Sequence, residues 1–167
     1  LQVMLHDAIS LADDGPVAIR YPRGTAHNVD ERDVGFSTHA RKVRAGNGSV
    51  CVLAVGKMVA SAHRAADKLA EQGIEATVWD VRCCSPLDPE MLADAAQHHT
   101  VLTFEDGIRD GGIGMSAADQ MRAINAEVPV QVFGLPDRFI PQGNADRILA
   151  ALGLDADGIA VSIRAAI

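Results

Sequence analysis

An apolar run that leads into four closely spaced glycines constrains the fold of this chain more than any other stretch. Residues 101–104 are mostly apolar, which is typical of a strand covered on both faces. The glycines permit positive φ angles and close backbone contacts; they are Gly107, Gly111, Gly112 and Gly114. From Met115 onward, apolar residues recur at helical spacing. A strand, a tight turn and a helix make half of a βαβ unit, so the stretch indicates a parallel sheet.

The same alternation of strands and helices extends over the chain from residue 40 onward. Apolar segments predict strands at residues 40–44, 50–55, 76–81, 101–104 and 128–133. Helical spacing and capping residues predict helices at residues 58–72, 88–98 and 115–126, and after Asn144 and Asp155. A cluster of turn residues at 45–49 separates the first two strands. We expect these two strands to form a hairpin, which would add one antiparallel strand to the sheet. The predicted fold class is α/β, with a mainly parallel mixed sheet and helices on both faces.

The N-terminal part of the chain follows a different pattern. Residues 1–14 predict the end of an amphipathic helix, residues 17–21 a strand, and residues 25–37 a polar linker. We therefore expect residues 1–36 to be the end of one domain plus a linker, and residues 37–167 to form another domain. The chain begins without Met and inside a predicted helix, so we expect it to be a piece of a longer polypeptide.

Composition excludes several classes of function. Hydrophobic residues make up 48% of the 167 residues, which favours a globular chain. The net charge of −7 argues against a nucleic-acid or anionic-membrane partner. No apolar run reaches the roughly 20 residues that span a bilayer, and no signal-peptide pattern opens the chain. Cys51 lies in an apolar run, and the adjacent Cys83 and Cys84 are unsuited to pair with each other, so we expect reduced thiols of a cytoplasmic protein. No CxxC or HxxxH spacing is present, so we expect no metal site.

The glycine-rich turn and the acidic residue before it are candidates for chemistry. The turn matches neither dinucleotide nor P-loop motifs and contains no Lys that could reach a phosphate. Its two readings are close packing of a helix, against a strand or a neighbouring subunit, and anion binding at the helix N-terminus. Glu105 stands at the end of a central strand, but no second group is identified beside it for acid–base catalysis.

Arg23 is the candidate binding residue. It follows the predicted strand 17–21, in a turn whose backbone is restricted by Pro22 and Gly24. Ligands of open α/β sheets lie beyond the carboxyl ends of strands, and a guanidinium there can bind a phosphate bidentately. A surface ion pair is the alternative for Arg20 and Arg23.

Several stretches together resemble one family. They are residues 15–24 (GPVAIRYPRG), 80–88 (DVRCCSPLD), 105–114, 134–143 (GLPDRFIPQG) and 152–159. In this order they resemble the C-terminal part of the 1-deoxy-D-xylulose-5-phosphate synthases, which are transketolase-like thiamine diphosphate enzymes. The resemblance implies a transketolase C-terminal domain over residues 37–167, preceded by the end of the pyrimidine-binding domain. Alternatives are a transketolase proper, a 2-oxo-acid dehydrogenase β-subunit, or a non-catalytic α/β dimerisation module.

The resemblance also implies an activity. Family members join a two-carbon unit from pyruvate to D-glyceraldehyde 3-phosphate, with thiamine diphosphate and Mg²⁺, and they are homodimers. The last Arg of the family's RYPRG motif binds the phosphate of the acceptor, and it corresponds to Arg23. The family's Mg²⁺–diphosphate motif and the region with the Glu that activates thiamine have no match here. The resemblance therefore assigns no catalytic, cofactor-binding or metal-binding residue to this chain, which we expect to be inactive alone.

Overall fold

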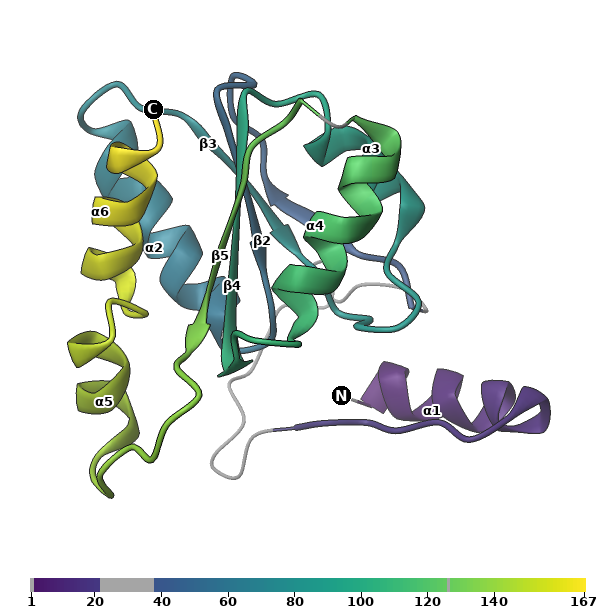
Figure 1. The fold of residues 1–167 in the computed structure, drawn as a ribbon. Helices are drawn as coiled ribbons and strands as arrows, with labels where there is room; N and C mark the ends of the chain where they lie inside the picture. The colour runs from purple at the N-terminus through teal and green to yellow at the C-terminus, as the bar shows by residue number, and fades with distance from the viewer. Residues whose placement is uncertain (1, 22–37, 126) are drawn as a thin grey trace.

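Five strands form one mixed sheet in the computed structural model, which describes residues 2–21, 38–125 and 127–167. They are β1 (Arg41–Arg44), β2 (Val50–Ala54), β3 (Ala76–Asp80), β4 (Thr100–Ile108) and β5 (Val130–Leu135). Their order across the sheet is β1-β3-β2-β4-β5 (Figure 1). β1 runs antiparallel to β3, and all other neighbouring strands are parallel. The predicted α/β class with a mainly parallel mixed sheet is confirmed.

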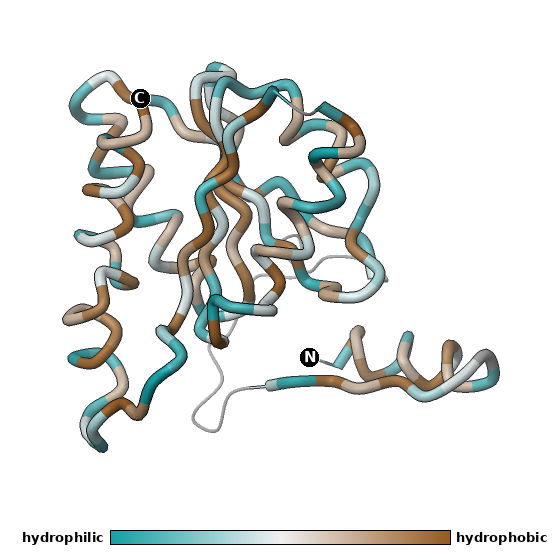
Figure 2. Tube along the Cα trace, in the orientation of Figure 1, coloured by the Kyte–Doolittle hydropathy of each residue, from teal (hydrophilic) through white to brown (hydrophobic). Residues whose placement is uncertain are grey.

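Helices cover both faces of this sheet (Figure 1). One face carries α2 (Met58–Ala70), α5 (Ala145–Ala151) and α6 (Ala156–Ala165), and the other carries α3 (Pro89–Ala95) and α4 (Ile113–Ile124). β2 lies at the centre and every one of its residues is buried, because both of its faces are covered. Figure 2 shows the central strands as a mostly hydrophobic part of the chain. The core therefore has two layers, one on each side of the sheet.

The predicted hairpin between the first two strands is wrong, although the antiparallel strand exists. β1 pairs with β3, with Arg41 opposite Asp80, and not with β2. The connection to β2 passes close to β3 at Gly46, where a Cβ would lie 2.5 Å from the backbone nitrogen of Thr77. Only glycine permits this close backbone contact. The turn cluster therefore does not close a hairpin: it carries the chain past β3 to β2.

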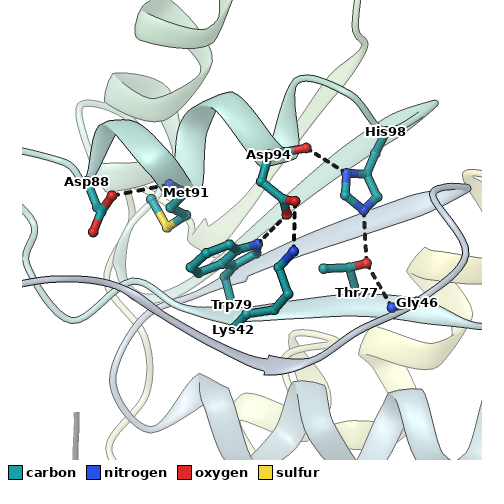
Figure 3. Close-up of polar contacts among 8 residues, drawn as sticks. All are labelled: Lys42, Gly46, Thr77, Trp79, Asp88, Met91, Asp94 and His98. Carbon is teal, nitrogen blue, oxygen red and sulfur yellow. Dashed lines mark hydrogen bonds and ion pairs between the residues drawn. The ribbon is translucent and has the colours of Figure 1, made fainter. Parts of the chain in front are cut away.

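Asp94 of α3 links this helix to β1 and β3 (Figure 3). Its carboxylate accepts hydrogen bonds from Lys42 Nζ at 2.7 Å and from Trp79 Nε1 at 2.8 Å. The Lys42 ammonium also lies 5.1 Å from the centre of the Trp79 ring. Burial alone would raise the pKa of Asp94, but the hydrogen bonds from Lys42 and Trp79 outweigh it, and the net pKa is lowered.

His98 links the end of α3 to the connection after β1 (Figure 3). Its Nδ1 lies 2.9 Å from the Asp94 carbonyl oxygen, which can only accept, so Nδ1 donates this hydrogen bond. Its Nε2 is hydrogen-bonded to the Thr77 hydroxyl at 2.9 Å, and that hydroxyl accepts from the Gly46 N–H. These groups satisfy one another inside the fold, which indicates a structural role for this histidine.

The three predicted helix N-caps are confirmed. Asp88 caps α3 by accepting from the backbone N–H groups of Glu90 and Met91. Asn144 caps α5, and Asp155 caps α6, in the same way. Asp88 also accepts from the Ala40 N–H at 2.8 Å, so it joins α3 to the chain just before β1. Burial would raise the pKa of Asp88, but its backbone hydrogen bonds outweigh this and lower the pKa.

The N-terminal part is helical as predicted, but the strand predicted at residues 17–21 is absent. α1 (Gln2–Leu11) is followed by a 3₁₀ turn, η1 (Ala12–Asp14), and then by extended backbone that pairs with none of the described strands. Val17 is 44% exposed and Tyr21 is 66% exposed, because no described strand lies beside this segment to bury these side chains. The linker and the domain boundary predicted around residue 36 lie outside the described residues.

Candidate functional site

The carboxyl ends of β3 and β4 are where a ligand site of an open α/β sheet is expected. We call this region the carboxyl edge, and it comprises residues 80–84, from the last residue of β3 onward, and residues 105–112, which include the end of β4 and the turn after it. β4 extends to Ile108, beyond the predicted strand 101–104. Its pairing with β5 shifts between Phe104 and Ile108, which marks a bulge or irregularity. Such irregularities redirect side chains, and the acidic residues of this edge lie within this one.

Glu105 is the most deeply buried acid of the carboxyl edge. Glu105 is only 5% exposed to solvent, and its Oε1 accepts a hydrogen bond from the Gly114 N–H at 3.0 Å. Gly114 lies in the first turn of α4, whose N-cap residue Gly112 provides no side-chain cap. The carboxylate of Glu105 therefore serves as the cap of α4 from a neighbouring strand, at the positive end of the helix dipole.

The glycines of the turn provide the space for this carboxylate. A Cβ on Gly112 would collide with Glu105 Oε1, and a Cβ on Gly107 would lie 2.8 Å from Glu105 Oε2. A Cβ on Gly114 would lie 2.6 Å from Val132 Cγ1 of β5. The predicted close packing of the helix against a strand is confirmed. The Gly114 N–H at this helix N-terminus binds the chain's own carboxylate.

Asp106 points to a different partner from its neighbour Glu105. Its Oδ1 accepts a hydrogen bond from Arg20 NH1 at 3.0 Å, across 86 residues of sequence. In Figure 1 the segment that follows α1 ends below the arrowhead of β4. This ion pair therefore joins the N-terminal segment to the carboxyl edge. Arg20 thus forms an ion pair, which the sequence left open as the alternative to phosphate binding, while Arg23 lies outside the described residues.

Two half-buried cysteines follow β3 at the same edge. Cys83 and Cys84 are free thiols. Burial raises the pKa of Cys84, and the nearby charge of Arg20 partly opposes that rise. Burial also raises the pKa of Asp80, which is opposed by Arg82. The carboxyl edge thus collects acids, thiols and Arg20 from segments that are far apart in the sequence.

The described part of the carboxyl edge encloses only a very small cavity. A cavity of about 10 Å³ lies between β4 and the first turns of α3 and α4, lined mainly by apolar side chains together with Thr103 and Glu105. This volume is at the lower limit for one water molecule, roughly 10–15 Å³, so no substrate fits there. Among the described residues, no group of three or more His, Cys, Asp or Glu side chains is placed to hold a metal ion. No helix in the described ranges is long and apolar enough to cross a membrane.

Sequence reasoning missed the partners of two residues of this edge. Glu105 and Asp106 are adjacent acids at a strand end, which is a signal of a special position, but their partners lie 9 and 86 residues away. The absence of a capping side chain at the start of α4 is the one local signal that a remote carboxylate caps this helix.

Comparison with known proteins identifies the domain that carries this edge. The family described as the transketolase C-terminal domain matches residues 38–159. The chain belongs to this family. A solved structure described as a split-gene transketolase, an inactive β4 tetramer, aligns with 86% of this chain and 47% of its own, at a TM-score of 0.76 and 28% identity. The transketolase C-terminal fold thus agrees with the predicted one.

Curated relatives confirm the resemblance to the 1-deoxy-D-xylulose-5-phosphate synthases. The synthase of Thermobifida fusca is 39% identical over 96% of this chain and 26% of its own length. The synthase of Anaeromyxobacter sp. (strain Fw109-5) is 41% identical over 99% of this chain and 27% of its own length. The synthase of Burkholderia thailandensis is 40% identical over 96% of this chain. The chain spans about a quarter of the length of these relatives.

Proposed function

We propose that this chain forms the C-terminal part of a cytoplasmic, thiamine diphosphate-dependent transferase, a 1-deoxy-D-xylulose-5-phosphate synthase. The enzyme condenses pyruvate with D-glyceraldehyde 3-phosphate and forms 1-deoxy-D-xylulose 5-phosphate and CO₂. The sugar phosphate is a precursor of isoprenoids, thiamine and pyridoxal phosphate. One observation carries the proposal: synthases of this name match 96–99% of the chain at 39–41% identity.

Within this enzyme, residues 1–36 are the end of the pyrimidine-binding domain and its linker, and residues 37–167 are the transketolase C-terminal domain. The family match begins at residue 38, which supports this boundary. The C-terminal domain forms part of the active-site wall and of a homodimer. A similar solved structure is described as a tetramer, which supports an oligomeric state for this protein.

Among the described residues we identify no site for the cofactors of this reaction. They contain no cluster of metal-binding side chains, and the helix N-terminus of α4 is already occupied by Glu105. We therefore derive no step through thiamine diphosphate or Mg²⁺, whose binding we assign to the part of the enzyme that precedes this chain. The 167-residue chain alone is expected to be inactive, and a solved relative described as inactive supports this.

Arg23 is the residue that we assign to the acceptor phosphate. Its guanidinium can form two parallel hydrogen bonds to a phosphate, and Pro22 and Gly24 restrict the backbone on either side. Arg20, three residues earlier, lies at the carboxyl edge through its ion pair with Asp106. This position supports a role for the segment beside the strand ends, where ligands of α/β sheets bind.

The test uses the complete polypeptide, with Arg23→Gln and the control Arg122→Gln, whose side chain is 70% exposed on α4. Formation of 1-deoxy-D-xylulose 5-phosphate is measured against the concentration of each substrate. We expect Arg23→Gln to raise KM for D-glyceraldehyde 3-phosphate at least about tenfold, because a charge-assisted bidentate contact is lost, and to leave KM for pyruvate nearly unchanged. Equal kinetic constants for the two variants would show that Arg23 does not bind the acceptor phosphate.

A second candidate function is that of a transketolase proper, which the solved split-gene transketolase favours. The choice of donor separates the two functions. The proposed synthase takes its two-carbon unit from pyruvate with release of CO₂, whereas a transketolase takes it from a ketose phosphate. Turnover with a ketose phosphate donor, and none with pyruvate, would select the second function.

A further inference from the structure

Two adjacent cysteines at the carboxyl edge take no part in the capping and ion-pair contacts described above. Cys83 and Cys84 are both free thiols, and both are half-buried, so reagents can reach them from the surface. Cys51, by contrast, is fully buried within β2. The accessible thiols of this chain therefore occur as one neighbouring pair.

The chain turns sharply where this pair begins. Arg82 has a φ of 55°, in the left-handed region that few residues other than glycine adopt. The backbone N–H of Cys83 donates to the Val81 carbonyl oxygen at 2.6 Å. The Arg82 side chain is also held, because its NH1 donates to the His39 carbonyl oxygen at 2.8 Å. Hydrogen bonds of the backbone and of a side chain thus fix the turn that places both thiols after the end of β3.

Adjacent cysteines are too close along the backbone for an ordinary disulfide. The peptide bond between Cys83 and Cys84 is trans, and consecutive Cα atoms across a trans bond lie about 3.8 Å apart. Disulfide-bonded cysteines usually have Cα atoms about 4.4–6.8 Å apart. An additional atom between the two sulfur atoms enlarges the ring and relieves this constraint. The pair therefore suits a bridging atom that binds sulfur strongly and needs two sulfur ligands.

The surroundings of the pair favour a ligand that reacts with neutral thiols. Burial raises the pKa of Cys84, and the neighbouring Cys83 and Glu105 add to the rise, so this thiol is protonated at neutral pH. A metal ion needs thiolates and has to displace their protons. No group of three or more His, Cys, Asp or Glu side chains in the described ranges is placed to complete a zinc-type site. A trivalent arsenic atom with one organic substituent needs only two sulfur ligands and condenses with thiols.

We propose that Cys83 and Cys84 form a binding site for monosubstituted trivalent arsenicals, R–As=O. In the reaction, R–As=O and two thiols give R–As(S–Cys)₂ and one water molecule. Two As–S bonds form, the As=O bond and two S–H bonds break, and both thiol protons leave in the water. Neither arsenic nor sulfur changes its oxidation state. The inference does not depend on the proposed function, because it requires only the two thiols.

The experiment uses the reduced complete polypeptide and phenylarsine oxide, with the variants Cys83→Ser and Cys84→Ser. Each protein is incubated with the arsenical and a monothiol competitor, 2-mercaptoethanol, and then labelled with N-ethylmaleimide. Mass spectrometry quantifies the label on the peptide that contains residues 83 and 84, so cysteines elsewhere in the polypeptide do not affect the readout. Cys51 is the internal control, because a buried thiol should stay unlabelled with or without the arsenical. Thermal unfolding midpoints establish that each variant is folded.

We expect phenylarsine oxide to lower the labelling of both wild-type thiols at least about tenfold, because the second As–S bond forms within one molecule. A dithiol competitor, 2,3-dimercaptopropanol, should restore the labelling. In each single variant the remaining thiol should be labelled as fast with the arsenical as without it, because the monothiol competes successfully for a single As–S bond. Wild-type labelling that the arsenical leaves unchanged would overturn the proposal. Equal protection of the wild type and of either single variant would also overturn it, because one thiol would then suffice.

Discussion

Substitution of Gly114 by alanine tests the packing that organises the carboxyl edge. The new Cβ would lie 2.6 Å from Val132 Cγ1 and would collide with Thr103 Oγ1, where ordinary contacts are 3.4–4 Å. Both neighbours lie on strands of the sheet, so α4 must move by roughly 1 Å to make room. That movement also lengthens the hydrogen bond from the Gly114 N–H to Glu105, which is 3.0 Å long.

The expected loss of stability combines two destabilising effects and one stabilising effect. Overpacking in a close-packed layer costs about 1–3 kcal/mol. Loss of a hydrogen bond to a charged group costs about 1.5–3 kcal/mol. Alanine is about 1 kcal/mol better than glycine inside a helix, which offsets part of this cost. We therefore expect Gly114→Ala to lower the free energy of unfolding by about 2–4 kcal/mol.

Gly143 provides the matched control. A Cβ there would lie 3.6 Å from its nearest neighbour, Ile148 Cδ1, which is an ordinary contact. Gly143→Ala should change the stability by no more than about 1 kcal/mol, and in the stabilising direction, because alanine reduces the entropy of the unfolded chain. The two variants are thus expected to differ in sign.

Urea unfolding of the 167-residue chain measures both effects, with the fluorescence of Trp79 as the probe. This residue is the chain's single Trp and lies 9% exposed in β3, so its signal reports on the sheet. The free energy of unfolding comes from linear extrapolation at constant slope. Addition of Val132→Ala to Gly114→Ala should recover part of the loss, because it removes one colliding atom. Equal stabilities of Gly114→Ala and Gly143→Ala would refute the packing argument.

Two further predictions concern pH. The pKa of Asp88 is lowered in the folded chain, so its stabilising contribution is present above the unfolded pKa of about 3.9 and is lost as pH falls through the lower folded pKa. Asp88→Asn should therefore lose less stability than the wild type between pH 6 and pH 3 in urea unfolding, and equal losses would contradict this. The pKa of Asp80 is raised by burial, so its contribution is present below the unfolded pKa and is lost as pH rises through the folded pKa. Asp80→Asn should gain stability relative to the wild type as pH rises from 3 to 7; a relative loss over that range would count against the burial argument.

Local signals were sufficient for the strands and helices after residue 40. The continuous apolar run of β2 indicates a strand covered on both faces, and it is fully buried. Asp88 followed by Pro89 marks the start of α3, and the side chain of Asp88 caps that helix. These signals act over a few residues, because capping and periodicity depend on neighbours in the sequence.

Contacts between distant segments could not be predicted in the same way. The glycine cluster after β1 indicates a turn, but the backbone of β3 that Gly46 touches lies about 30 residues further on. The strand predicted at residues 17–21 has a suitable pattern and no described partner strand, so the pattern alone did not decide its structure. The pairing of Arg20 with Asp106 spans 86 residues and depends on the irregular end of β4.

The identity of the product tests the central claim most directly. The complete polypeptide is incubated with ¹³C-labelled pyruvate, D-glyceraldehyde 3-phosphate, thiamine diphosphate and Mg²⁺, and the products are identified by NMR. The account predicts that the label appears in 1-deoxy-D-xylulose 5-phosphate, and that the 167-residue chain alone forms none of it. A complete polypeptide that forms no labelled 1-deoxy-D-xylulose 5-phosphate, but transfers a two-carbon unit from a ketose phosphate, would contradict the account.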